Sequence, residues 1–245
     1  MKNTRKKQDI ICPKCSDTGY INFVRDGITY SRPCECLEKR LSMFHYKSMN
    51  IPKSFMDKDI DSFIISNKSQ QTAVSAIRDY IGKFPDISYG LLFMGPAGTG
   101  KTHLAVSVFK AIRTRTRDRM LFMDASSLLN NIKHSIGDRY SDESSTPDII
   151  RDVSSIPILL LDDLGSQKVS MWTQDIIKII ISHRYNNNLL TFITTPYEDR
   201  PKSPEKEKLE QRIGEINRSR LYEMCRIISL EGEDFRKMMI NPRLL

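Results

Sequence analysis

Long apolar runs are missing from this sequence, and no stretch approaches the roughly 18 residues that a transmembrane helix needs. The first residues are basic, but no apolar segment follows them, so the pattern of a secretory signal is absent as well. Cysteine is scarce after position 36, where only Cys225 remains, and we expect that residue to be a buried apolar one. These absences predict a cytoplasmic protein that does not span a membrane.

Acidic residues are in deficit. The chain has 38 Lys and Arg against 30 Asp and Glu, which gives a net charge of +8. That charge favours an anionic partner, with nucleic acid ahead of a membrane surface, and a solvated basic protein is the other interpretation. The length of 245 residues allows one ordinary domain and a small module, and a hydrophobic content of 39% supports a packed core.

The first 36 residues hold four cysteines in two close pairs. Between the pairs, two β-rich runs at 20–24 and 28–30 flank Asp26-Gly27, which is a strong signal for a hairpin. A hairpin brings the pairs together, which predicts a tetrahedral zinc site of the zinc-ribbon type, whose metal stabilises a module too small to fold alone. Two disulfides, four free thiols and an iron–sulfur cluster are the alternatives, and a reducing cytosol argues against the disulfides. The predicted zinc ligands are Cys12, Cys15, Cys34 and Cys36.

Three regions follow one another along the chain. The zinc-binding module takes residues 1–50, a linker with one helix over 70–81 takes 51–87, and the nucleotide-binding domain takes 88–245. In the third region apolar strands alternate with helices, which predicts an α/β fold with a parallel sheet and helices on both faces. The predicted strands are 91–94, 120–124, 158–162, 190–195 and 226–230.

The strongest motif, G-x-x-x-x-G-K-[ST], occupies positions 95–102. It lies between an apolar run and a helical pattern over 103–113, the setting of a phosphate-binding loop, where main-chain N–H groups and the helix N-terminus face the phosphates. Lys101 is expected to reach the β- and γ-phosphates and Thr102 to hold Mg²⁺. A Gly-rich turn without a ligand is the alternative. The predicted nucleotide-binding residues are Gly95, Pro96, Ala97, Gly98, Thr99, Gly100, Lys101, Thr102 and His103.

Two carboxylates, Asp162 and Asp163, end the buried strand 158–162. They follow the loop by about sixty residues, which is the usual separation in sequence between neighbouring parallel strands, so we expect this strand to lie beside the strand that precedes the loop. Asp162 is expected to bind Mg²⁺, directly or through water, and Asp163 to orient or deprotonate the attacking water. The strand 190–195 ends in Thr194-Thr195, and either hydroxyl is a candidate for the γ-phosphate, unless both only satisfy the local backbone.

These features together resemble the AAA+ ATPases of the DnaC/DnaI helicase-loader group, of which the transposition helper IstB is a near relative. The resemblance spans residues 50–240, and zinc-bearing members of the group have a module like the one at the N-terminus. It rests on Ile51-Pro52 with Phe55, GPAGTGKTHLA from Gly95, LLLDDLG from Leu159, Arg184-Tyr185, RLYEM from Arg220 and GEDFR from Gly232.

The resemblance implies an AAA+ P-loop fold, with ATP and Mg²⁺ as cofactors beside Zn²⁺, and ATP hydrolysis that is slow or stimulated by DNA. Arg220 matches the group's arginine finger, which acts on ATP held by the adjacent subunit, so self-association through the ATP sites is implied. Arg236 matches a C-terminal arginine of the group. The segment 126–136 matches a helix used for assembly and single-stranded DNA binding, and candidate phosphate contacts are Lys133, Arg139, Arg113, Arg115, Arg117 and Arg119.

The implied function is the loading of a ring-shaped replicative helicase onto single-stranded DNA, with the N-terminal module gripping the helicase and no membrane partner. A transposition helper that acts on duplex DNA is one alternative. An ATP-switched binding module without turnover is another, which Pro196 keeps open because the group usually carries Asn there and proline offers no side-chain amide. The expected catalytic residues are Lys101, Asp162, Asp163, Thr195 and Arg220.

Overall fold

The computed structural model describes residues 12–137, 145–201, 203 and 205–238. The chain divides into two compact units, Met1–Ser48 and Met49–Leu245. The second unit begins at the edge of its sheet, where the Met49 carbonyl accepts a hydrogen bond from the Phe122 amide at 2.7 Å. Among the described residues, no helix combines the length and the apolar character that crossing a bilayer would demand.

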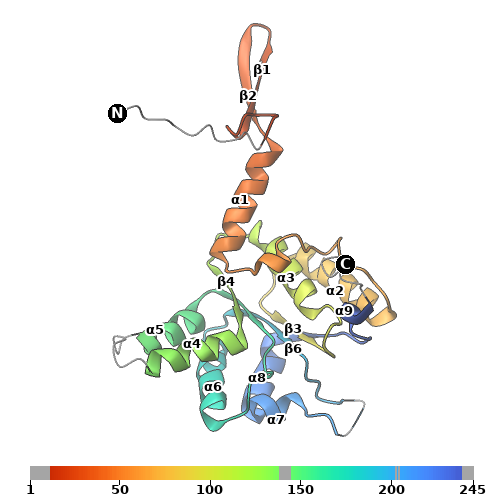
Figure 1. Ribbon diagram of the computed structural model, residues 1–245, viewed down its shortest axis with the longest axis vertical. Coiled ribbons are helices and arrows are strands. Elements are labelled where there is room, and N and C mark those ends of the chain that lie inside the picture. Colours follow the sequence, from red (N-terminus) through yellow and green to blue (C-terminus); the bar gives the residue numbers. More distant parts are fainter. Residues whose placement is uncertain (1–11, 138–144, 202, 204, 239–245) are drawn as a thin grey trace. The chain divides into compact units, whose positions relative to one another are not determined.

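The first unit is a hairpin followed by a helix. Strands β1 (Tyr20–Arg25) and β2 (Ile28–Pro33) pair antiparallel, and α1 (Glu35–Ser48) follows them (Figure 1). The turn residues Asp26 and Gly27 have φ of 52° and 76°, the left-handed conformations that a two-residue hairpin of type I′ requires. The hairpin that the sequence predicts is therefore present, and its strands are longer than the β-rich runs.

The second unit is built on a parallel five-stranded sheet in the order β4-β5-β6-β3-β7. The predicted α/β class and its five strands are confirmed. One expectation is wrong: the strand that ends in Asp162 is not the neighbour of the phosphate-loop strand, because β6 is inserted between β3 and β5. The strands are β3 (Gly90–Met94), β4 (Met120–Asp124), β5 (Ile158–Asp162), β6 (Leu190–Thr195) and β7 (Cys225–Ser229).

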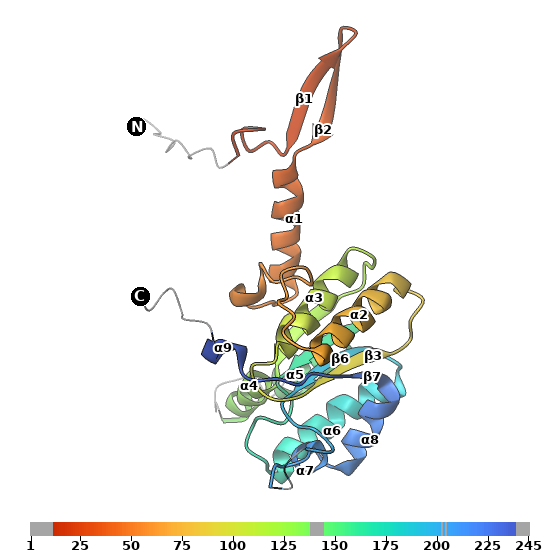
Figure 2. The same cartoon turned by 90° about the vertical axis from the view of Figure 1, so that its right-hand side faces the viewer.

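Helices cover both faces of this sheet (Figures 1 and 2). On one face lie α2 (Lys68–Lys83) and α3 (Lys101–Arg113). The opposite face carries α4 (Ala125–Gly137), α5 (Ser145–Ser155), α6 (Met171–Asn186), α7 (Leu209–Ile213) and α8 (Glu215–Met224). The short helices η1 (Lys53–Phe55) and α9 (Phe235–Met238) precede and follow these layers in the chain.

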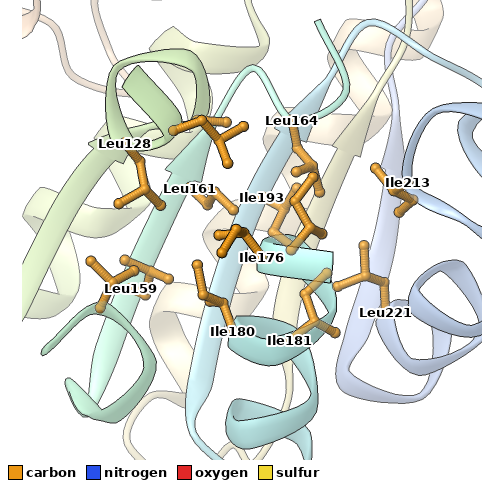
Figure 3. Close-up of a cluster of buried hydrophobic side chains, with 14 of the residues drawn as sticks. Leu128, Leu159, Leu161, Leu164, Ile176, Ile180, Ile181, Ile193, Ile213 and Leu221 are labelled. Atoms are coloured by element: carbon orange, nitrogen blue, oxygen red, sulfur yellow. The ribbon is translucent and has the colours of Figure 1, made fainter. Parts of the chain in front are cut away.

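The core follows the alternation of side chains along the strands. Leu159, Leu161 and Ile193 point into the face covered by α4 and α6, where they join a cluster of buried Leu and Ile side chains (Figure 3). On the other face, the Phe192 ring makes edge contacts with Tyr80 of α2 and Phe109 of α3, at centroid distances of 6.0 and 6.1 Å. Burial of each such side chain stabilises the fold by about 1.5–3 kcal/mol, so the sheet is held rigidly from both sides.

One fully buried cation ties three elements together. The Arg184 guanidinium of α6 donates to the carbonyls of Ile156 and Leu190, at 2.7 and 2.8 Å, and to the Thr191 hydroxyl at 2.9 Å. These partners lie at the end of α5 and the start of β6, where carbonyl groups are left without helix or ladder partners. Burial lowers the pKa of Arg184 to about 9. Arg184, one of the residues that carry the resemblance, therefore has a structural role in this chain.

Candidate active site and metal centre

The segment between β3 and α3 is folded as a phosphate-binding loop. Gly98 and Gly100 have φ of 77° and 95°, and Gly100 caps the N-terminus of α3. A Cβ atom on Gly98 would lie 1.8 Å from the Asp234 carboxylate, so no larger residue fits there. The first-turn amides of α3 have no helical partners, which makes this turn suited to anions.

Lys101 is the first residue of α3, and it is almost completely buried, with 7% exposure. Its ammonium donates to the carbonyls of Gly95 and Pro96, each at 2.7 Å. Burial lowers the pKa of Lys101 to about 8, while the carboxylates of Asp163 and Asp162 act in the opposite direction. A poorly hydrated cation held over the loop in this way is suited to triphosphate oxygens.

The Asp162 carboxylate receives two side-chain hydrogen bonds. Thr102 Oγ1 donates to Asp162 Oδ1 at 2.8 Å, and Thr194 Oγ1 donates to the same oxygen at 2.6 Å. Burial raises the pKa of Asp162, and these two hydrogen bonds lower it. The structure thus brings together the predicted Mg²⁺ ligands Thr102 and Asp162, even though their strands are not neighbours. Hydroxyl and carboxylate oxygens are ligands that Mg²⁺ prefers, so the donor set fits this ion.

Of the two threonines that end β6, the structure turns Thr194 toward the acids. The Thr194 hydroxyl also accepts from the Asp163 amide at 2.9 Å, so it contacts both acidic residues. The Thr195 hydroxyl, expected to be catalytic, donates to the Leu164 carbonyl at 2.7 Å and accepts from the Tyr197 amide at 3.2 Å. Thr195 is fully buried. The geometry therefore corrects the expectation: Thr194 faces the site and Thr195 satisfies the backbone.

A cavity of about 630 Å³ lies over the loop. Ligand pockets in proteins commonly span about 300–1,000 Å³, so its size suits a nucleoside triphosphate. Pro196 lines it together with the acids, and so does Asp124 at the end of β4, which sequence reasoning missed. Its lining includes Ala97, Gly98, Thr99, Gly100, Lys101, Thr102, His103, Asp162, Asp163 and Thr194 from the predicted site.

One wall of the cavity comes from the segment predicted as a linker. Phe55, Lys58, Phe63 and Ile64 contribute to it. The segment is fixed to α3, because Lys110 Nζ donates to the carbonyls of Met56 and Lys58 at 2.6 and 2.7 Å. Sequence periodicity gave no signal for this role, because Phe63 lies outside any helix or strand and Phe55 ends the three-residue helix η1.

His103 and Phe63 join this wall to the loop. His103 Nε2 lies 2.8 Å from the Asp59 carbonyl, and the Phe63 ring makes an edge contact with the imidazole at a centroid distance of 5.2 Å. A Cβ atom on Gly100 would lie 2.4 Å from that phenyl ring. Burial lowers the pKa of His103, which favours the neutral imidazole near pH 7. His103 thus positions an apolar wall beside the loop.

The two arginines that the resemblance singles out differ in their placement. Arg236 lines the cavity and forms an ion pair with Asp234 at 2.9 Å, on a segment anchored where the Phe235 amide donates to the Gly98 carbonyl at 3.1 Å. Arg220 is outside the cavity lining. Its guanidinium donates to the Ser182 hydroxyl of α6 and lies 5.7 Å from the centroid of the Tyr185 ring.

The candidate phosphate contacts of the basic segments fall into two groups. Arg113 donates to the carbonyls of Thr116 and Asp118, and Arg115 donates to the Ile81 carbonyl, so both arginines hold main chain. The second group is exposed: Lys133 lies on α4, and Arg117 and Arg119 precede β4. Arg139 lies outside the described residues.

The four N-terminal cysteines form one cluster in the first unit. Their sulfurs all lie within 4.8 Å of one another, and no described cysteine is in a disulfide. Tetrahedral zinc with Zn–S bonds of about 2.3 Å sets its sulfurs about 3.8 Å apart, and the Cys12 and Cys34 sulfurs are 3.8 Å apart. The Cys15 and Cys36 sulfurs are 3.2 Å apart, and their contact lowers the pKa of Cys15 while it raises the pKa of Cys36. The cluster fits a tetrahedral thiolate-bound metal.

The fold and the site define a class. A parallel sheet in this order, with a phosphate-binding loop after a central strand and an acidic pair at the same edge, is the arrangement of an AAA+ P-loop ATPase domain. The family model described as IstB-like ATP binding protein matches residues 38–240. The chain belongs to this family.

Curated relatives and solved structures agree with that assignment. The replicative helicase loader DnaI of Bacillus subtilis (strain 168) is 24% identical over 199 residues, which cover 78% of this chain and 62% of the relative. The replicative helicase loader DnaC of Escherichia coli (strain K12) is 24% identical over 135 residues, 55% of this chain and 54% of the relative. The chain thus spans little more than half the length of these two relatives. A crystal structure of the DnaC helicase loader is 35% identical with a TM-score of 0.63, and the match covers 73% of this chain and 99% of that one.

Proposed function

We propose that this protein uses ATP to load a ring-shaped replicative helicase onto single-stranded DNA. The ATP-dependent part of the proposal rests on the hydrogen bonds that Thr102 and Thr194 donate to the Asp162 carboxylate. Asp162 is 60 positions beyond Thr102 in the sequence. The similarity to the DnaC and DnaI loaders supports the choice of a helicase as partner. The net charge of +8 agrees with a nucleic-acid partner.

In the proposed reaction, Lys101 and the amides at the start of α3 hold the triphosphate, and Thr102 and Asp162 hold Mg²⁺. When bound, this ion would neutralise part of the negative charge on the phosphates. Asp163 orients the attacking water, and Thr194 positions Asp163 by accepting its amide hydrogen. Asp163 has φ of 57°, an uncommon conformation for a residue with a side chain, so a fixed partner for its amide helps to keep the carboxylate in place.

Arg220 is proposed to act on ATP bound by a neighbouring copy. Its place outside the cavity of its own chain supports this role, because a finger must reach a site other than its own. Arg220→Ala is expected to keep ATP binding and lose both turnover and assembly. Arg218→Ala is the matched control, since Arg218 is on the same helix but pairs with Asp199 at 2.7 Å. Normal turnover by Arg220→Ala would contradict the assignment.

The N-terminal module is proposed to bind Zn²⁺ through its four cysteines and to contact the helicase. The four sulfurs lie within 4.8 Å of one another, which supports a single tetrahedrally bound ion such as zinc. An iron–sulfur cluster is the alternative that the four cysteines leave open by their type alone. Metal analysis of protein purified without added metal distinguishes these, because zinc gives about one equivalent per chain without visible absorbance.

A transposition helper is the second candidate function. The family match to IstB-like proteins favours it, and such a helper would act on duplex DNA. A third candidate is an ATP switch without turnover, favoured by Pro196 at the cavity wall. ATP hydrolysis is therefore measured alone, with single-stranded DNA and with duplex. Stimulation by single strands supports the loader, stimulation by duplex alone supports the transposition helper, and no turnover in any condition supports the switch.

A further inference from the structure

The hairpin of the first unit exposes aromatic side chains that the proposed ATPase does not use. Cross-strand pairing places Phe23 opposite Tyr30, Ile21 opposite Arg32 and Arg25 opposite Ile28, and these pairs share one face of the hairpin. We call this the aromatic face; it consists of Ile21, Phe23, Arg25, Ile28, Tyr30 and Arg32.

The centre of the aromatic face is a stacked pair of rings. The Phe23 and Tyr30 centroids are 5.7 Å apart with an interplanar angle of 20°. Their exposed fractions are 45% and 44%, so about half of each ring is available to a partner. Exposed aromatic side chains gathered on one face usually mark a binding surface, since leaving them in water is unfavourable.

An arginine lies on each side of this pair along the hairpin. Arg32 is one same-face step from the rings toward the cysteines, and Arg25 is one step toward the turn, each step being about 7 Å. Arg25 has an acidic neighbour, Asp26, at 3.8 Å, and both side chains are more than three-quarters exposed, so the pair is weak. Strands β1 and β2 contain no acidic residue. The face is therefore cationic at both ends and aromatic in the middle.

We propose that the aromatic face binds single-stranded DNA, with bases stacked on Phe23 and Tyr30 and phosphates paired with Arg25 and Arg32. A single strand offers exposed base faces and regularly spaced phosphates, which match the order of rings and guanidinium groups. Duplex DNA keeps its bases stacked inside and offers only the phosphates. The inference rests on the proposed function for its choice of nucleic acid, and it adds a DNA contact in the first unit, apart from the ATPase domain.

The test uses the 245-residue chain, loaded with Zn²⁺, and a fluorescein-labelled oligo(dT), with binding followed by anisotropy at several salt concentrations. Phe23→Ala/Tyr30→Ala is expected to weaken binding at least about fivefold, the effect of losing one stacked base. Arg25→Gln/Arg32→Gln is expected to reduce the slope of log affinity against log salt by about 0.7 per arginine. Tyr20→Ala is the matched control, because Tyr20 is 50% exposed on the opposite face of the same hairpin.

A direct readout of stacking comes from Tyr30→Trp. Oligo(dT) is expected to quench the new tryptophan, after subtraction of the wild-type signal from Trp172. Metal content per chain shows that each variant keeps a folded module. Oligo(dU) and oligo(U), which share their base, compare DNA with RNA. Losses with DNA alone, or with both polymers, support the face as a single-strand site, whereas losses with RNA alone overturn its assignment to DNA.

Unchanged affinity of Phe23→Ala/Tyr30→Ala would overturn the proposal. So would equal losses for duplex and single strands, or loss of helicase binding with oligo(dT) affinity intact, which would make the face a protein contact. ATP binding is measured in the same variants and is expected to be unchanged. If the ATPase proposal is wrong, the wild-type chain will not bind nucleotide. The effect of the hairpin variants on DNA binding can still be measured in that case.

Discussion

The two adjacent threonines at the end of β6 allow a sharp test of how the site is built. Thr194→Val keeps the shape of the side chain and removes a hydroxyl that donates to Asp162 Oδ1 at 2.6 Å and accepts from the Asp163 amide at 2.9 Å. A hydrogen bond to a charged group contributes about 1.5–3 kcal/mol. If that interaction orients the acids in the transition state, its loss lowers ATP turnover about 10- to 150-fold. The pKa of Asp162, already raised by burial, rises further, because Thr102 remains its one side-chain donor.

Thr195→Val is the matched control. Its hydroxyl serves the Leu164 carbonyl and the Tyr197 amide, so the variant is expected to lose about 1 kcal/mol of folding stability and to keep its turnover. Steady-state phosphate release at saturating Mg²⁺ and ATP measures the first quantity, and chemical denaturation measures the second. The reasoning is refuted if Thr194→Val turns over ATP at the wild-type rate, or if the two variants exchange their effects. The proposed role of the Thr194 hydroxyl would also be contradicted if the fraction of Thr194→Val that is unfolded accounted for the whole fall in turnover.

Three further predictions address the core, the loop lysine and the metal. Arg184→Met leaves the buried carbonyls of Ile156 and Leu190 without this donor and is expected to lower the free energy of unfolding in urea by about 1–3 kcal/mol per acceptor; a total loss below about 1 kcal/mol would contradict this role. The pKa of Lys101 is about 8, so ATP affinity measured by calorimetry falls up to tenfold per pH unit above pH 8, with uptake of a proton. Because the pKa of Lys101 in the folded chain is below its value in the unfolded chain, the free energy of unfolding without ATP rises between pH 8 and 10.5. An ATP affinity that does not change from about pH 7 to 9.5 would contradict the role of Lys101. Treatment with a chelator, which would remove the proposed zinc, is expected to make the hairpin sensitive to protease and to leave ATP binding intact. A hairpin that stays resistant to protease after this treatment would contradict the proposed metal-dependent fold.

Much of the fold could be predicted because its signals are local. The loop 95–102 has its glycines, lysine and threonine in consecutive positions, and the Asp26-Gly27 turn demands left-handed residues that Asp and Gly tolerate. The strands were predictable because each is a short apolar run bounded by polar residues. In each case the residues that decide the structure are within a few positions of one another.

The order of strands was not predictable from the same signals. Inserting β6 between β3 and β5 depends on how five similar apolar strands pack against helices on both faces, and none of these strands differs enough in sequence to fix its neighbour. The cavity wall formed by Phe55 and Phe63 was missed for a related reason. Phe63 lies outside any helix or strand and Phe55 ends the three-residue helix η1, so neither belongs to a periodic pattern that would indicate burial. Their place in the cavity wall depends on Lys110, which holds the main chain of that segment.

The sequence by itself determined that the chain has a phosphate-binding loop, an acidic pair at a strand end and a hairpin flanked by two pairs of cysteines, since each signal lies in residues close together in the sequence. Only the tertiary structure decided which threonine faces the acids. Neighbours in a strand point to opposite sides, and the side that Thr194 takes is set by the strands beside it. It also decided that Arg184 is buried while Arg220 is outside its own cavity, because burial is a property of packing between distant segments.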